Sequence, residues 1–316
     1  MMDPDVGEIF SRANNSGETM KPSNQQQHPV GTNNGRHRME NPGAIKVLMY
    51  HRIVRDPELA RRHSFCLHMD EFQRHLEWID RWGFTPITFE DYRLFADDQL
   101  VLPRKPIIIT FDDGYLDTYD VAFPILQEFG MHAVVFVLGD RSLTTNVWDS
   151  GTSMPPTQLL NNHHILEMAA AGIEIGAHSL THVRLTELDS HAAWEEISRS
   201  RILLEILLNL PVRTFSYPYG LVNPSVKKMV ETAGFQHACS VWSGPPTFGK
   251  DNYELRRISI LNSTTTSGLA LKIVTPFQYY NWMQWKMRTV LHGSNGVHDH
   301  PQESRVHQIN STDEEE

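Results

Sequence analysis

Pro106-Ile-Ile-Ile-Thr-Phe-Asp-Asp-Gly114 is a short apolar run that ends in two adjacent carboxylates and a glycine. Apolar and β-branched residues bounded by a turn signal are typical of a buried strand. Asp112 and Asp113 would therefore emerge at the C-terminal end of a strand. Parallel α/β proteins place their binding and catalytic groups at that end of the sheet. The stretch predicts a parallel sheet with a pair of acids at its functional edge.

A second motif, Gly176-Ala-His-Ser-Leu-Thr-His182, follows another strand-like run at residues 173–175. Its two histidines are four residues apart, a spacing that lets both side chains share one face of a helical turn. His178, His182 and one of the two aspartates would form a divalent-metal site with open coordination positions. The other aspartate would lie beside that site as a candidate general base.

Strand-like and helix-like segments alternate along the rest of the chain, an order typical of a parallel sheet covered by helices. Seven or eight strands favour an α/β barrel over an open sheet, although the pattern leaves the closure of the barrel open. The predicted strands are residues 45–50, 107–111, 133–138, 173–175, 214–217, 237–241 and 258–261.

Helical patterns lie between these strands, and most of them have a polar residue at the start and a glycine after the end. Asp70, Asp117 and Thr157 are the expected first residues of three of them. The aromatic run at 277–285 is expected to be a terminal helix packed on the barrel rather than a membrane anchor, because polar residues interrupt it. The other predicted helices are residues 70–82, 117–129, 157–171, 190–208 and 224–233.

The two ends of the chain differ from the middle in composition. Residues 1–43 are rich in Asn, Gln, Ser, Gly and Pro, and residues 293–316 are similar and finish in Asp313-Glu-Glu-Glu316. Such segments bury too little apolar surface to offset the entropy lost on ordering. We therefore expect a disordered leader over 1–43, one folded domain over 44–292 and a disordered acidic tail over 293–316.

Bulk composition excludes some functions. Of the 316 residues, 40% are hydrophobic and 21% are charged, so the chain can bury a sizeable core. The net charge is −10, and the tail carries six acids against one arginine, which leaves the middle only mildly acidic. We expect no nucleic-acid partner, since that would require a basic face.

The expected compartment is the cytoplasm. Residues 1–10 carry neither the basic nor the apolar region of a secretory signal. No stretch reaches the roughly 18 to 20 apolar residues of a spanning helix, so stable membrane insertion is not expected. Cys66 and Cys239 form no ligand pattern and are expected to be reduced. The oligomeric state is not predicted.

Three motifs together resemble a known family. Thr110-Phe-Asp-Asp-Gly114, His178-Ser-Leu-Thr-His182 and Phe215-Ser-Tyr-Pro-Tyr-Gly220 are similar, in order and spacing, to the first three motifs of the polysaccharide deacetylases, which are carbohydrate esterase family four with the NodB homology domain. The resemblance covers about residues 47–261. It implies an α/β fold with a single distorted (β/α) barrel of about seven parallel strands. Residues 44–292 would be the catalytic domain of a metal-dependent hydrolase that removes acetyl groups from N-acetylated sugars.

The resemblance also assigns roles. Asp113, His178 and His182 would hold one divalent metal ion, with Zn²⁺ the default for such a mixed N/O ligand set. Asp112 would be the general base that takes a proton from water whose pKa the metal lowers. Tyr219 would give a backbone N–H to the developing oxyanion. The adjacency of the two acids does not by itself say which one is the ligand.

The chain departs from the commonest family pattern in three places. Ser216 stands at or near the position where the third motif usually opens with an arginine. Residues 239–244 contain no Asp-Trp pair of the fourth motif, and Asn262 and Ser263 follow Leu261 where the fifth motif has Leu-x-His. Because of these differences, the motifs supply no residue for two usual roles: the partner that orients the base and the acid that protonates the leaving group.

The poly-β-1,6-N-acetylglucosamine deacetylase subgroup shows similar gaps. Met49-Tyr-His-Arg-Ile53 resembles the Tyr-His motif of that subgroup, so His51 could take the role of the acid. Leu255-Arg-Arg-Ile258 resembles its late Pro-Arg-Ile segment, so Arg257 could tether Asp112.

Three functions remain open from the sequence. The first is removal of N-acetyl groups from an amino-sugar polysaccharide or glycan precursor, with an N-acetylated carbohydrate as the substrate. The second is a small-molecule amidase of the same superfamily, and the third is a catalytically inactive carbohydrate-binding module. All three are compatible with one barrel, because the fold does not determine the function.

Overall fold

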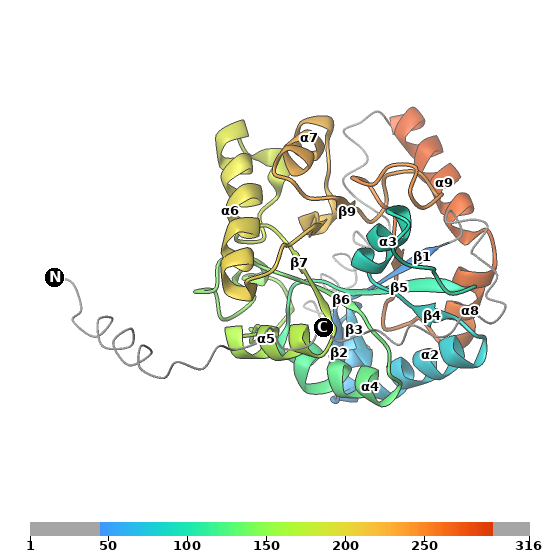
Figure 1. Ribbon diagram of the computed structural model, residues 1–316. Helices are drawn as coiled ribbons and strands as arrows, with labels where there is room; N and C mark the ends of the chain where they lie inside the picture. The colour runs from blue at the N-terminus through green and yellow to red at the C-terminus, as the bar shows by residue number, and fades with distance from the viewer. Residues whose placement is uncertain (1–44, 293–316) are drawn as a thin grey trace, which may run out of the picture. The chain divides into compact units, whose positions relative to one another are not determined.

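A sheet of parallel strands organises the part of the chain that the computed structural model describes, residues 45–292 (Figure 1). Seven strands follow one another in the order β10, β1, β5, β6, β7, β8 and β9, and β4 (Thr85–Pro86) pairs with the beginning of β5. All seven coincide with predicted strands, and the α/β class is confirmed. Their bounds are β1 Lys46–Tyr50, β5 Pro106–Phe111, β6 Val134–Val137, β7 Glu174–Ala177, β8 Thr214–Ser216, β9 His237–Cys239 and β10 Ile258–Ser259.

The sheet curves round and its two outer strands meet through a single connection. Cys239 of β9 forms a parallel bridge with Leu255, which precedes β10. Leu255 N donates to the carbonyl of Ala238, and Ser240 N donates to the carbonyl of Leu255. The sheet is therefore a distorted barrel whose closure depends on irregular backbone.

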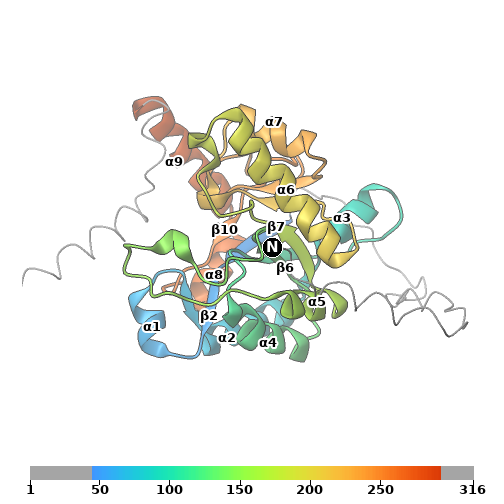
Figure 2. The same cartoon turned by 90° about the vertical axis from the view of Figure 1, so that its left-hand side faces the viewer.

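Helices lie outside the sheet, and Figure 2 shows β6 and β7 between α6 on one side and α4 and α5 on the other. No helix of the described residues is long and apolar enough to cross a membrane. A separate two-stranded sheet pairs β2 (Arg52–Val54) with β3 (Cys66–His68). The helices are α1 Pro57–Arg62, α2 Met69–Arg81, α3 Phe89–Ala96, α4 Phe123–Glu128, α5 Asn162–Ala170, α6 Ser190–Leu208, α7 Pro224–Thr232, α8 Thr266–Val274 and α9 Phe277–His292.

Two of the three predicted helix starts were wrong. His68 rather than Asp70 caps α2, because its ring accepts the N–H of Asp70. Asp117 does precede a helix, since a π-helical turn at Thr118–Ala122 leads directly into α4, but its carboxylate pairs with Arg52 and makes no capping hydrogen bond. Thr157 lies in a loop that pairs with other loop segments, so α5 begins only after Asn161.

Alternate residues of the strands enter two apolar clusters. One cluster, which includes Leu48 and Ile109, packs against the surrounding helices, and the other, which includes Ile108 and Phe136, packs around Phe89 at the start of α3. The main strands are buried on both faces, which explains why their sequences are continuous apolar runs.

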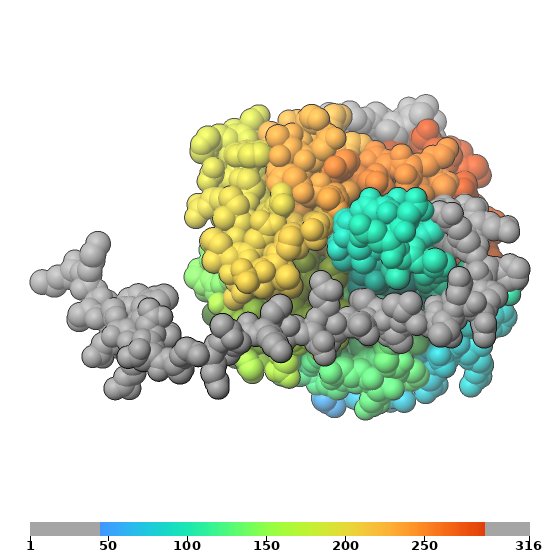
Figure 3. Space-filling view, in the orientation of Figure 1, coloured from blue at the N-terminus to red at the C-terminus, as the bar shows by residue number. Residues whose placement is uncertain are grey.

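Helix α3 covers the N-terminal ends of the strands. The N–H of Glu90 donates to the carboxylate of Glu174, the first residue of β7. Figure 3 shows α3, in teal, at the front of this face. The opposite, C-terminal ends of the strands are left for the functional site.

Candidate active site and metal centre

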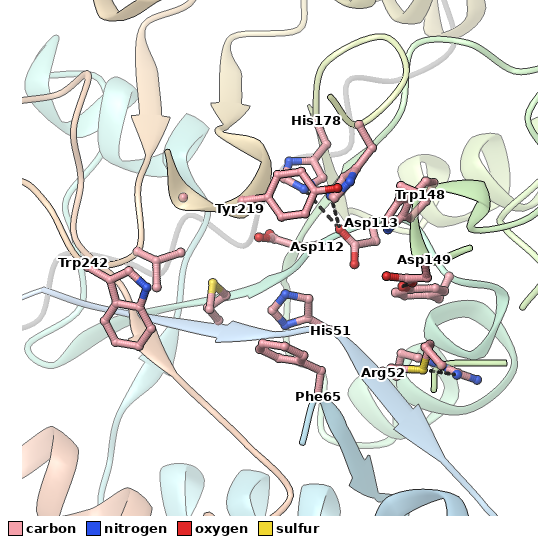
Figure 4. Close-up of a pocket in the computed structure, with 16 residues that line it drawn as sticks. His51, Arg52, Phe65, Asp112, Asp113, Trp148, Asp149, His178, Tyr219 and Trp242 are labelled. Carbon is pink, nitrogen blue, oxygen red and sulfur yellow. Dashed lines mark hydrogen bonds and ion pairs between the residues drawn. The ribbon is translucent and has the colours of Figure 1, made fainter. Parts of the chain in front are cut away.

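A pocket of about 120 Å³ lies at the C-terminal ends of β1, β5, β7 and β8 (Figure 4). Six of the seven predicted site residues line it: His51, Asp112, Asp113, His178, His182 and Tyr219. The seventh, Arg257, is buried behind Asp112. Parallel strands with short C-terminal turns thus bring together residues that are far apart in the sequence.

Asp113, His178 and His182 form a buried cluster. Their potential ligand atoms lie within 4.8 Å of one another. Asp113 Oδ1 is 3.1 Å from His178 Nε2 and 3.2 Å from His182 Nε2. The predicted helical turn was wrong, because Ser179 and His182 have φ of 59° and 65° and the two rings converge from an irregular loop.

The donor atoms of this cluster fit a divalent cation. His178 Nδ1 lies 2.8 Å from the carbonyl oxygen of Ser216, which only accepts, so Nδ1 donates and a neutral ring presents the lone pair of Nε2 to Asp113. Two electron pairs would then face each other at 3.1 Å, an arrangement that a proton or a cation between them stabilises. A backbone carbonyl that orients a histidine in this way is common around metal ligands.

The protonation of the cluster follows from burial and charge. Burial alone would raise the pKa of Asp113, but hydrogen bonds with His178 and His182 hold it well below its ordinary value. Burial lowers the pKa of His182, while the hydrogen bond with Asp113 and the charge of Asp112 raise the pKa of His178 despite its burial. The carboxylate is therefore ionised, as a metal ligand must be.

Asp112 is held by a bidentate ion pair. Arg257 Nη1 and Nη2 donate to its two carboxylate oxygens at 2.7 Å each. Ser216 Oγ accepts from Arg257 Nη2 at 2.9 Å and donates to Asp112 Oδ2 at 3.2 Å. Burial would raise the pKa of Asp112, but Arg257 outweighs it and the pKa lies below its ordinary value.

His51 follows β1 and packs beside the two aspartates. Its ring lies 4.5 Å from the ring of Phe65, and its buried Nδ1 has no hydrogen-bond partner among the described residues. Burial lowers the pKa of His51, and the carboxylates of Asp113 and Asp112 oppose this. The imidazole thus lies on the same rim of the pocket as Asp113, His178 and His182.

Tyr219 occupies the turn after β8 with φ of 59°. The edge of its ring meets His182 at 4.7 Å between centroids, and the guanidinium of Arg184 lies 4.3 Å from the ring centroid on a face. These two contacts fix a residue whose left-handed backbone is unusual for a non-glycine side chain.

The side walls of the pocket differ in character. Trp242 lies on the opposite side of the metal cluster from Trp148, Asp149 and Arg52 (Figure 4). The ring of Trp148 stacks on that of His182 at 4.4 Å between centroids. Arg52 Nε pairs with Asp117 at 2.7 Å.

Comparison with known proteins identifies the family. Residues 100–238 match the family model described as "Polysaccharide deacetylase". The chain contains a polysaccharide deacetylase domain. Members of the family are hydrolases that act on the carbon–nitrogen bonds of N-acetyl groups.

Relatives of this chain are found among bacterial proteins. YxkH of Bacillus subtilis (strain 168), assigned to the polysaccharide deacetylases, is 28% identical over 221 residues, which is 70% of this chain and 73% of that protein. The poly-β-1,6-N-acetyl-D-glucosamine N-deacetylase of Staphylococcus epidermidis (strain RP62A) is 25% identical over 201 residues, 61% of this chain and 67% of the relative. The Streptococcus pyogenes deacetylase PplD, solved in complex with acetate, shares the fold with a TM-score of 0.62 at 24% identity, over 73% of this chain and 98% of PplD.

Several residues of the polysaccharide deacetylase site were missed in the sequence. Trp148 and Asp149 lie in a polar loop without a recognisable motif, and Arg52 was read only as part of the Tyr-His motif. Ser216 was noted for replacing an arginine, and its hydroxyl group is hydrogen-bonded to both Asp112 and Arg257, the residue before β10. A Trp-Asp pair in a loop after a barrel strand is the signal that could have indicated the first two.

Proposed function

We propose that the protein removes N-acetyl groups from an amino-sugar polysaccharide or glycan precursor, using one divalent metal ion held by Asp113, His178 and His182. The observation that carries this proposal is the pairing of two different carboxylates at one strand end. Asp113 faces two imidazoles, and Asp112 faces a guanidinium. Asp113 is therefore suited to bind a cation, and Asp112 is suited to accept a proton.

When bound, a divalent ion lowers the pKa of water and polarises the carbonyl of the acetamido group. The mixed nitrogen and oxygen ligand set makes Zn²⁺ the first candidate. Three protein ligands leave coordination positions open for water and substrate. Ser216 supports this site by holding His178 in the required tautomer.

Asp112 would act as the general base. Arg257 and Ser216 keep its carboxylate ionised and fix the direction of its oxygens. A base that is oriented before substrate binds loses little freedom in the transition state. Asp112 would accept the proton of the attacking water, and the backbone N–H of Tyr219 would donate to the oxygen on which negative charge develops.

His51 would deliver a proton to the leaving nitrogen. An amine leaves an amide readily only when it is protonated as the C–N bond breaks. The ring of His51 lies against Phe65 on the floor of the pocket, near both carboxylates (Figure 4). His51 lines the pocket and its side chain is only partly buried, which supports a contact between the ring and a bound substrate.

Acetate release tests the proposal directly. The purified protein should release acetate from N-acetylated oligosaccharides, lose this activity on chelation and regain it when Zn²⁺ is added. His178→Ala combined with His182→Ala should lower both metal content and activity. Metal content that is unchanged in the double variant would remove the proposed site, and an absence of acetate with every sugar would leave the small-molecule amidase or the inactive module.

A further inference from the structure

The loop between β6 and α5 forms the polar wall of the pocket. Residues 138–161 connect these two elements, and Trp148 and Asp149 of this loop line the cavity beside the proposed metal ligands (Figure 4). The loop is anchored by backbone bridges, one between Thr145 and Gln158 and one that joins Leu159 to Tyr115. An anchored loop can hold a side chain in one position while substrate binds.

Asp149 is fixed through one of its two carboxylate oxygens. The buried side chain of Asn146 donates from Nδ2 to Asp149 Oδ2 at 2.7 Å and accepts the N–H of Thr157 at 2.6 Å. The hydroxyl of Tyr115 donates to the same oxygen, Oδ2, at 3.2 Å. No described residue donates a hydrogen bond to Oδ1 of Asp149. The carboxylate is therefore oriented but half of its accepting capacity is unused.

No described cation forms an ion pair with Asp149. The guanidinium of Arg52, which also lines the pocket, pairs with Asp117 at 2.7 Å and contacts the sulfur of Met154 at 3.6 Å. The opposite wall contains the indole ring of Trp242 (Figure 4). A sugar in this pocket would meet a hydrogen-bond acceptor on one side and an aromatic ring on the other.

We propose that Asp149 determines specificity: its Oδ1 accepts a hydrogen bond from a hydroxyl of the sugar that carries the acetamido group. The substrate class is thus a neutral N-acetylhexosamine. The negative charge of Asp149 disfavours sugars that carry sulfate, phosphate or carboxylate near that hydroxyl, because like charges in a partly desolvated pocket repel. This inference rests on the proposed N-deacetylase function.

Asp149→Asn tests the inference with little change of shape. The amide oxygen can still accept from Asn146 and Tyr115, and the amide nitrogen replaces the accepting Oδ1 with a donor. A hydrogen bond to a charged acceptor is strong, so kcat/KM for an N-acetylglucosamine oligosaccharide should fall about 10- to 100-fold. Hydrolysis of 4-nitrophenyl acetate, which has no sugar hydroxyl, should stay within about twofold of wild type. Relative activity on the 6-sulfated or carboxylate-bearing N-acetylhexosamine should rise.

Controls separate recognition from structure. Tyr115→Phe removes one support of Asp149 but leaves the carboxylate, so it should cost much less than Asp149→Asn. Metal content and the thermal midpoint should be unchanged in both variants. Equal losses of activity on the sugar and the ester would assign Asp149 to the integrity of the metal site and overturn the inference. Wild-type activity of Asp149→Asn on the neutral oligosaccharide would also overturn it. In either case, acetate release by the wild-type protein still supports the proposed function. If the wild type releases no acetate from any sugar, both fail together.

Discussion

Asp112 and Asp113 are consecutive residues with opposite surroundings. Asp113 has φ of 72°, in the left-handed region, whereas Asp112 ends a buried strand and its N–H donates to the carbonyl of Tyr50. The reversal of the backbone sends one carboxylate to two histidines and the other to Arg257. Aspartate tolerates this conformation better than most side chains, so the strain is small enough to be held by the packing around it.

Substitution of each aspartate by asparagine should give different results. Asp112→Asn should keep the metal and lose about a hundredfold to ten-thousandfold of turnover, because the general base is removed. Asp113→Asn should lower metal content instead, since a neutral amide is a weaker ligand. Metal analysis together with acetate release measures both effects. The proposed roles would be reversed if Asp112→Asn lost the ion while Asp113→Asn kept it.

His51→Ala addresses the proton that reaches the leaving group. We expect metal content to stay intact and turnover of an amide substrate to fall by about a hundredfold or more. An activated ester has a leaving group that needs little protonation, so its turnover should fall much less. The ratio of the two rates is the measurement. Equal losses would indicate that His51 positions the substrate, and an unaffected amide rate would show that another group supplies the proton.

At the scale of elements, β7 runs from the end of the barrel that α3 covers to the end that contains the candidate active site. Its C-terminal end leads to His178, and its first residue, Glu174, is buried under α3. Thr214 Oγ1 and the N–H of Glu90 each donate to the Glu174 carboxylate at 3.0 Å. Burial nevertheless raises the pKa of Glu174 to about 7.

Glu174→Gln should therefore change how stability depends on pH. A carboxyl whose pKa is raised in the folded state contributes stability below its ordinary pKa of about 4.3, and this contribution is lost as the pH rises through 7. Glutamine can accept from Glu90 N and donate to the hydroxyl of Thr214, which can also accept. Thermal unfolding should show the variant gaining up to roughly 3 kcal/mol relative to wild type at pH 8, with little gain at pH 4. A gain of equal size at both pH values would mean that the charge of Glu174 is not the cause.

The strands were easier to predict than the contacts. Apolar runs such as Pro106–Phe111 are buried on both faces, so their composition alone marks them. The strands β2, β3 and β4 were not predicted, because each is short and includes Arg52, His68 or Pro86 in place of a continuous apolar run. The start of α5 is delayed because residues 157–159 pair with distant segments. Local propensity contains no information about such partners.

The metal ligands and the base could be proposed from motifs, whereas their supports could not. Arg257 and Asp112 are 145 residues apart along the chain, and only the resemblance to a subgroup linked them. Asp149 has no motif at all, since its importance lies in the pocket that it lines. Motifs identify the atoms that take part in chemistry, but the folded structure is needed to see what surrounds them.

At the scale of the whole molecule, the boundaries of the catalytic domain stay a prediction. The proposed leader and tail, 1–43 and 293–316, lie outside the described residues. Because their composition contains little apolar surface, deletion of both should leave the melting temperature and the specific activity nearly unchanged. A marked loss of either would show that a deleted segment stabilises the barrel. The cytoplasmic compartment is likewise a prediction, which fractionation of cells would test.

The strand β1 pairs with β5 on one side and with β10 on the other, where Leu48 is opposite Ile258. A chain synthesised from its N-terminus carries the three proposed metal ligands and the Ser216 carbonyl that orients His178 before it carries Arg257. Without that arginine, Asp112 has no counter-ion, and β1 keeps an unpaired edge. A truncated chain that ends between Ser216 and Arg257 would therefore lack an oriented base, and we expect catalysis only from chains translated as far as β10.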